Sequence, residues 1–176
     1  MKQLAMRVAV CLFISGGTVA QPSPRCESLS TMTDAERLTL YKCLPFGSDI
    51  DSVAARGIVE HSLGSFRDVT SVYGYSVTLA LSFKAGHLDG IGYGVLGSTA
   101  TSDSLREGLG RFYSRLCGEP VVHDLVSDGD TLRVDLWSGP ECDVGIFRVL
   151  GVQDMVTWGL AAPGTLLARL TAAERR

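Results

Sequence analysis

Hydrophobic and polar residues alternate along residues 75–84, which is the clearest pattern in the chain. Bulky side chains occupy the odd positions and small or polar side chains the even ones. The odd set comprises Tyr75, Val77, Leu79, Leu81 and Phe83. A period of two predicts a β-strand with one buried face. A second strand is expected over residues 88–96, in which Ile91, Tyr93 and Val95 alternate with Gly90, Gly92 and Gly94.

The turn between these two strands leaves their register open. A two-residue loop at residues 85–86 would pair Leu79 with Gly92, whereas a three-residue loop at 85–87 with a bulge would pair Leu79 with Tyr93. We favour the second register because it places both apolar sets on one face. The glycines then form a thin outer face, which suits either close approach by a partner or simply twisting of the strand.

An amphipathic helix is expected after this hairpin. Ser104 and Glu107 have capping-box spacing, which marks a helix N-terminus, and Gly118 with Pro120 marks the end. The apolar stripe comprises Leu105, Leu109, Phe112 and Leu116. The helix therefore has one face to bury, and it is expected to pack on the hairpin.

The first twenty residues have the pattern of a secretory signal peptide. Lys2 and Arg7 precede an apolar core over residues 8–14 and a small-residue cleavage site at residues 18–20. The apolar run is too short to span a bilayer, and no later segment is apolar enough to form a membrane span. We therefore expect a periplasmic or secreted protein whose mature chain begins near Gln21.

The charge balance argues against nucleic acid as a partner. The chain has 16 basic and 19 acidic residues, and removal of the signal leaves 14 basic residues, a net charge of about −5. Nucleic-acid binding needs a basic surface instead. The remaining length suffices for one packed domain over residues 21–162. The tail, residues 163–176, has leucines at helical spacing.

Four cysteines follow the signal: Cys26, Cys43, Cys117 and Cys142. An even count in an exported chain predicts two disulfides, for which three pairings are possible. We favour Cys26–Cys43 and Cys117–Cys142, which join the nearest partners in sequence. Zinc is the competing interpretation, but the chain has no CxxC pair and no histidine at ligand spacing. Neither a metal nor another cofactor is therefore expected.

Helices and strands are expected on both sides of the central helix. Thr33 with Glu36, and Ser48 with Asp51, have capping-box spacing for two short helices. Strands are expected over residues 68–73, 121–126, 131–137, 144–150 and 155–160. The predicted fold class is α+β, with antiparallel meander sheets covered on one face by helices. The repeated order of helix then strands indicates two possible halves, residues 44–97 and 98–162.

Residues that could carry catalysis or bind a metal are dispersed. His61, His87 and His123 have no helix-spaced partners. No GxSxG elbow and no Walker or dinucleotide fingerprint is present. Four aspartates cluster on one predicted hairpin, at Asp124, Asp128, Asp130 and Asp135. Calcium is one interpretation of that cluster, although the spacing does not match an EF-hand loop and ordinary turn chemistry is the alternative. No catalytic residue is assigned.

Three aromatic residues are the candidate binding residues: Tyr93, Trp137 and Trp158. Tryptophan and tyrosine are frequent among interface hot spots. Trp137 is out of phase with the other apolar residues of its strand, whereas Trp158 is in phase with its neighbours. This difference in phase allows one of the two tryptophans to be exposed, although packing of both in the core of a two-sided sheet is the favoured interpretation.

Two stretches resemble a recurring design of small exported bacterial proteins. One is Leu-Pro-Phe-Gly-Ser at residues 44–48, which leads into the helix with Val53. The other is Phe-Lys-Ala-Gly-His-Leu at residues 83–88, followed by a helix that ends in Arg-Leu-Cys-Gly-Glu-Pro at residues 115–120. They are similar to the helix-plus-meander modules of β-lactamase inhibitor protein and of the small lipoprotein of the outer-membrane β-barrel assembly machine. The resemblance implies protein binding rather than catalysis, although this chain has no lipobox.

The leading hypothesis is an exported, non-catalytic protein-binding module of the inhibitor, immunity or envelope-assembly type. Its partner would be another envelope or extracellular protein. The alternatives are an envelope hydrolase with a site assembled from distant residues and a carrier of a small ligand. A histidine beside a carboxylate or serine in a concave pocket would favour the hydrolase, and a large apolar cavity would favour the carrier.

Overall fold

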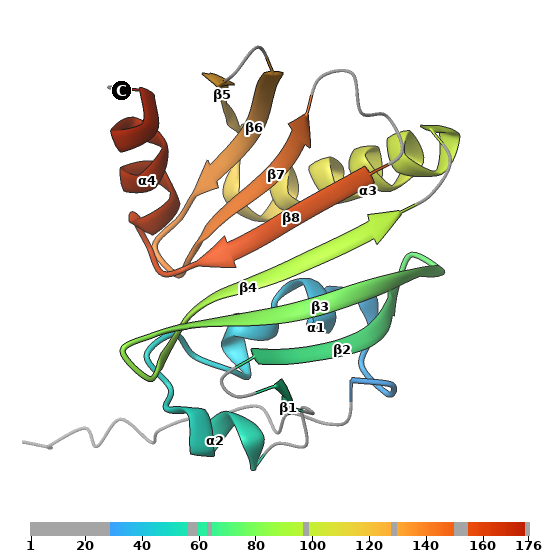
Figure 1. The fold of residues 1–176 in the computed structure, drawn as a ribbon. Coiled ribbons are helices and arrows are strands. Elements are labelled where there is room, and N and C mark those ends of the chain that lie inside the picture. The colour runs from blue at the N-terminus through green and yellow to red at the C-terminus, as the bar shows by residue number, and fades with distance from the viewer. Residues whose placement is uncertain are drawn as a thin grey trace, which may run out of the picture.

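An antiparallel sheet is the main element of the fold. The computed structural model describes residues 29–55, 60–62, 65–96, 99–127, 130–149 and 155–174. Within these ranges, eight antiparallel strands form a sheet in the order β1-β2-β3-β4-β8-β7-β6-β5. The strands are β1 (Glu60–Ser62), β2 (Ser65–Val72), β3 (Tyr75–Lys84), β4 (His87–Leu96), β5 (Val121–Ser127), β6 (Asp130–Ser138), β7 (Asp143–Val149) and β8 (Met155–Ala161). The predicted α+β class with an antiparallel meander is confirmed (Figure 1).

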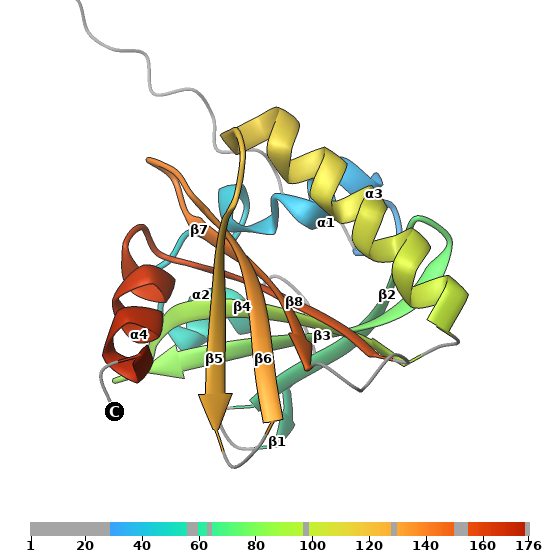
Figure 2. The same ribbon diagram turned by 90° about the horizontal axis from the view of Figure 1, so that it is seen from above.

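Helices lie on both sides of this sheet. They are α1 (Asp34–Leu38), the 3-10 helix η1 (Leu40–Lys42), α2 (Ile50–Ala54), α3 (Thr99–Cys117) and α4 (Thr165–Glu174). Helices α1 and α3 cover one face, and α4 packs against β5, β6 and β7 on the other (Figures 1 and 2). The predicted helical tail is therefore confirmed. The prediction that helices cover only one face is not, since α4 takes part of the second face.

Two four-stranded meanders share the sheet. Strands β1 to β4 follow one another, α3 then crosses to the far edge, and β5 to β8 return to the middle. The last strands of the two meanders, β4 and β8, pair from Gly90–Ala161 to Leu96–Met155. Residues 44–97 and 98–162, the two possible halves, each contain one meander. The centre of the sheet is built by both.

The predicted register of the β3–β4 hairpin is confirmed, but the predicted loop length is wrong. Leu79 pairs with Tyr93, as expected. The loop has two residues, Ala85 and Gly86, with φ of 52° and 81°, which is the left-handed geometry of a tight hairpin turn. The extra residue is Asp89, where the pairing shifts between Ser82 and Phe83. A β-bulge inside the strand thus sets the register.

Each face of the sheet has its own core. On the inner face, under α1 and α3, the odd-numbered side chains of β3 and β4 pack with apolar residues of β7 and β8. On the outer face, a smaller cluster of Val134, Leu136 and Leu170 lies under α4. Trp137 belongs to the inner core and its neighbours Val134 and Leu136 to the outer one. The part of β6 from Val134 to Trp137 is therefore covered on both sides, whereas Thr131 and Arg133 remain half-buried.

Two helix starts differ from the predictions. Helix α3 begins at Thr99, so Ser104 and Glu107 lie inside it and do not cap it. Helix α2 is capped by Asp49, whose side chain accepts from the Ser52 amide, rather than by the serine before it. A serine and an acidic residue three positions apart also fit the surface of a helix interior, so the pattern does not locate the first turn.

The inward stripe of α3 is also rotated relative to the prediction. Leu105, Leu109 and Tyr113 are fully buried, whereas Leu116 is about half exposed. Tyr113 takes the inward position because its hydroxyl donates to the Leu38 carbonyl oxygen, 3.1 Å away. A buried tyrosine needs such a partner.

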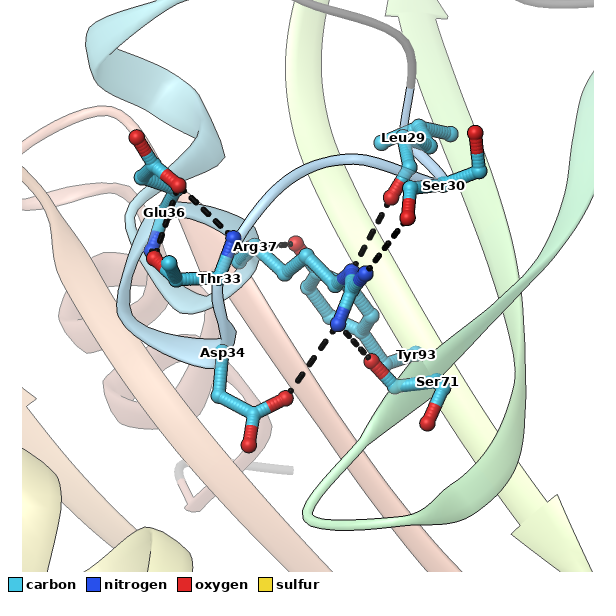
Figure 3. Close-up of polar contacts among 8 residues, drawn as sticks. All are labelled: Leu29, Ser30, Thr33, Asp34, Glu36, Arg37, Ser71 and Tyr93. Atoms are coloured by element: carbon cyan, nitrogen blue, oxygen red, sulfur yellow. Dashed lines mark hydrogen bonds and ion pairs between the residues drawn. The ribbon is translucent and has the colours of Figure 1, made fainter.

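Arg37 fastens α1 and the loop before it to the sheet (Figure 3). Its guanidinium donates to the carbonyl oxygens of Leu29 at 3.0 Å and Ser71 at 2.7 Å. It also contacts the Ser30 carbonyl at 3.4 Å and the Asp34 carboxylate at 3.3 Å. These bonds tie residues before α1 to the end of β2.

Candidate binding face of the sheet

Part of the outer face carries only small side chains. Helix α4 lies over β5, β6 and β7 on this face. Ala161 at the end of β8 is buried, but the other outward residues of β3, β4 and β8 whose burial is described are exposed or half-buried. Strand pairing aligns them in rows, among them Ala80–Gly92–Gly159 and Thr78–Gly94–Thr157. We call this surface the open face (Figure 1). It comprises Ser76, Thr78, Ala80, Ser82, Gly90, Gly92, Gly94, Thr157 and Gly159.

The central glycines of the open face are not required by the fold. Neither Gly92 nor Gly94 has a positive φ. A Cβ at Gly92 would meet only the Ala80 carbonyl oxygen, at 3.7 Å, and a Cβ at Gly94 only the Thr157 methyl, at 3.8 Å. Both distances are ordinary van der Waals contacts. Turn geometry and internal packing therefore leave room for a side chain at both positions.

At Gly145, in the same sheet, the packing of neighbouring side chains does require a glycine. It pairs with Gly159 in the next strand. A Cβ there would lie 2.9 Å from the Phe147 ring and 3.4 Å from the Leu166 side chain of α4. The Phe147 ring thus lies over Gly145 and marks where the open face meets α4.

The β-bulge at Asp89 forms a second border of the open face. The Asp89 carboxylate accepts from the Ser82 hydroxyl at 2.8 Å and pairs with Arg169 of α4 at 3.0 Å. The residues of the open face themselves have no ionisable side chains. The surface therefore offers hydroxyl groups and main chain, with charged residues at its borders: Asp89 at the bulge and Arg67 of β2, which pairs with Ala80.

The aromatic residues predicted as binding anchors lie in the core. Trp137 and Trp158 are 2% and 1% exposed, and Tyr93 is buried as well. Tyr93 stacks on Trp158 with ring centroids 4.8 Å apart, and the Trp137 indole donates to Ser114 at 3.3 Å. These side chains hold the inner core together and are not accessible to a partner. The residues that line the accessible face are the glycines and the serine, threonine and alanine residues that alternate with buried residues along β3, β4 and β8.

The structure places the two later cysteines near one another as thiols. Cys117 and Cys142 are both reduced, so the predicted disulfide between them is not formed here. A Cβ at Gly139 would lie 4.0 Å from the Cys117 sulfur and 3.5 Å from the Cys142 carbonyl oxygen. Burial raises the pKa of Cys142 to about 11, and the thiol hydrogen-bonds with the Tyr41 hydroxyl. The predicted Cys26–Cys43 pair cannot be placed, since Cys26 lies outside the described residues, as does the predicted signal peptide.

The aspartates considered as calcium ligands do not form a site in the described part of the chain. Asp124 instead makes two 2.7 Å hydrogen bonds with Arg133 on β6, which lower the pKa of its carboxyl group. Asp128 lies outside the described residues. Across those residues, no group of three or more histidine, cysteine, aspartate or glutamate side chains could hold a metal ion. His87 contacts the Gly47 carbonyl oxygen through Nδ1, at 3.1 Å.

Comparison with known proteins gives no family assignment. No protein-family model, no curated protein and no solved structure matches the chain. Within the described ranges, none of the helices combines the length and the apolar composition that crossing a bilayer requires.

Proposed function

We propose that this chain is an exported protein-binding module and that its partner docks on the open face. The observation that carries this proposal is the set of glycines on β4. Glycine inside a strand destabilises it by about 0.5–1 kcal/mol relative to alanine. Gly92 and Gly94 are therefore less favourable for strand stability than alanine would be, although the methyl group of an alanine would fit at both positions. Close approach of an external surface to the strand backbone accounts for both residues.

The chemistry of the open face indicates the kind of partner that fits it. The glycines form a shallow floor, and the hydroxyls of Ser76, Thr78 and Ser82 are exposed beside it. Projecting aromatic or aliphatic side chains of a partner can lie flat on this floor, and polar groups around them can pair with the hydroxyls. The absence of ionisable side chains on the face means that no charge has to be desolvated there. A folded protein with a projecting loop is the expected partner.

A bulky substitution on the glycine floor tests the proposal. The tagged chain is added to a native envelope and extracellular extract, and captured proteins are quantified for the wild type and for Gly92→Gln. We expect a stoichiometric partner for the wild type and at least about tenfold weaker capture for the variant, a change of about 1.4 kcal/mol. Thermal unfolding of the variant should be unchanged or shifted upward, because the strand loses a glycine.

Gly110→Gln is the matched control. Gly110 lies on α3, and a Cβ there would meet nothing within 4 Å. This variant should capture the partner as the wild type does. Equal capture by both variants would remove the open face from consideration, and a wild type that captures nothing would refute the binding function itself.

A further inference from the structure

Strand β5 is an edge of the sheet that no other described strand covers. Within the described residues it pairs only with β6, so the N–H and C=O groups of alternate β5 residues point away from the sheet. Such groups form a template for another strand. The other edge is different, because β1 has three residues and its pairing with β2 is irregular. Short, irregular edges resist pairing, whereas β5 has seven residues in unbroken register.

The side chains of β5 add apolar surface on both sides of this edge. Val121, Val122 and Val126 are 61%, 53% and 76% exposed. Val122 and Val126 share one face, and Val121 lies on the other. Neither lysine nor proline, which commonly protect edges, lies within the strand. An extended apolar strand is the ligand that matches both the main chain and these side chains.

Charge does not oppose the pairing of two such edges. Asp124 is at the centre of β5, and its carboxylate forms a two-bond pair with Arg133 at 2.7 Å for each bond. The ion pair lies on the same side of the sheet as Val122 and Val126. The edge thus presents a neutralised charge between two exposed valines.

We infer that a second copy of this chain covers β5, through antiparallel β5–β5 pairing about a two-fold axis. Such an axis requires one residue to lie opposite its own copy. With Asp124 at that position, Val122 of each copy lies opposite Val126 of the other. The two most accessible apolar groups on that face are then buried, and the sheet continues across the dimer. The open face on β3, β4 and β8 stays accessible, so this dimer does not depend on the proposed function.

Sedimentation of the purified protein tests the dimer. Measured from about 1 to about 200 μM, the wild type should shift from monomer to dimer, since an edge pairing of this size gives a weak interface. Val126→Lys should weaken dimerisation at least about tenfold. Val69→Lys is the control, because Val69 is 66% exposed but lies on β2, away from the β5 edge. It should leave dimerisation unchanged.

A charge-pair variant tests the register. Val122→Glu combined with Val126→Lys places opposite charges across the axis, so the double variant should dimerise more tightly than Val126→Lys alone. If the wild type were monomeric at every concentration, the dimer would be refuted. The β5 edge would then be a candidate site for pairing with an extended strand of a different protein. Equal weakening by Val69→Lys would overturn it as well, and failure of the double variant to recover would exclude the Asp124-centred register.

Discussion

Two buried tyrosine hydroxyls satisfy the last carbonyl groups of α1. The Tyr93 hydroxyl, from β4, donates to the Arg37 carbonyl, and the Tyr113 hydroxyl, from α3, donates to the Leu38 carbonyl (Figure 3 shows the first). A five-residue helix is not stable in isolation, and its final carbonyl groups have no hydrogen-bond partners within the helix. The two tyrosines therefore attach α1 to the sheet and to α3 at the same time.

Removal of one of these hydroxyls should destabilise the protein measurably. Tyr113→Phe keeps the ring but leaves the Leu38 carbonyl oxygen buried without its donor, which is expected to lower the free energy of unfolding by about 1–3 kcal/mol. Burial raises the pKa of Tyr113 well above its usual value, so the hydroxyl stays a donor and the loss should not vary between neutral and mildly alkaline pH. Urea denaturation measures it. Tyr73→Phe, at a partly exposed ring, should change stability little; an equal loss in both would contradict the capping role.

At the residue scale, the sequence predicts which side chains are apolar but not which ones a partner could reach. Trp137 is correctly placed on the face opposite Val134 and Leu136, yet it is buried because β6 has a core on each side. Tyr113 was missed as a core residue because its hydroxyl partner, the Leu38 carbonyl, is distant in sequence. The glycines of the open face could be found from their alternation, whereas the space around Gly92 could only be found from the packed sheet.

At the scale of elements, α4 depends on a carboxylate from a different element. Asp143 on β7 is fully buried, and its Oδ2 accepts from the amides of Leu166 at 2.9 Å and Leu167 at 3.4 Å. These amides belong to the first turn of α4 and have no partner within the helix. A negative charge at this end also interacts favourably with the helix dipole. Asp143 therefore holds α4 against the outer face.

Loss of this cap should loosen α4 selectively. Asp143→Ala is expected to lower the free energy of unfolding by about 0.5–2 kcal/mol, and amide hydrogen exchange should rise more in α4 than in α3. Asp143→Asn retains an acceptor oxygen and should recover most of the protection. If the alanine variant lost protection from exchange equally in α4 and α3, Asp143 would stabilise the whole fold rather than α4 in particular.

The local pattern of apolar and polar residues was sufficient to predict which segments are helices and which are strands. It was not sufficient to predict where these elements begin and end or which elements they contact. The alternation of residues 75–84 predicted strand β3 correctly. The positions of the apolar residues in β4 predicted that Leu79 pairs with Tyr93. The bulge that creates this register, at Asp89, has no local signature, because it is set by pairing with Ser82 and by the ion pair to Arg169. The start of α3 at Thr99 was likewise not located, because Ser104 and Glu107 have capping-box spacing although they lie inside the helix.

On the scale of the whole molecule, the repeated order of helix and strands predicts two meanders but not how they join. The joining pairs, Tyr93–Trp158 among them, lie between strands far apart in sequence. Pairing of β4 with β8 puts both meanders into a continuous sheet and leaves β5 at an edge. The open face and the β5 edge are thus consequences of the arrangement of the meanders, which no local pattern contains.

The same arrangement bears on the predicted Cys117–Cys142 disulfide, which would join the end of α3 to the turn between β6 and β7. Two thiols and an oxidised glutathione would exchange to give one protein disulfide and two reduced glutathiones. The pKa values of Cys117 and Cys142 are both raised by burial, so the reactive thiolate is scarce at neutral pH. The rate of closure should therefore increase about tenfold per pH unit from pH 7 to pH 9.

Closure should also stabilise the fold, by about 3 kcal/mol for a loop of this length. Intact mass after oxidation, with and without alkylation of thiols in denaturant, reports whether the bond forms, and urea denaturation reports the gain. Cys117→Ser is the control, since it removes the bond while Cys142 and its contact with Tyr41 stay in place. If the wild type kept both thiols alkylatable at pH 9, or if Cys117→Ser gained the same stability on oxidation, the Cys117–Cys142 pairing would be refuted. Any stabilisation on oxidation would then have to come from a disulfide that includes Cys26 or Cys43.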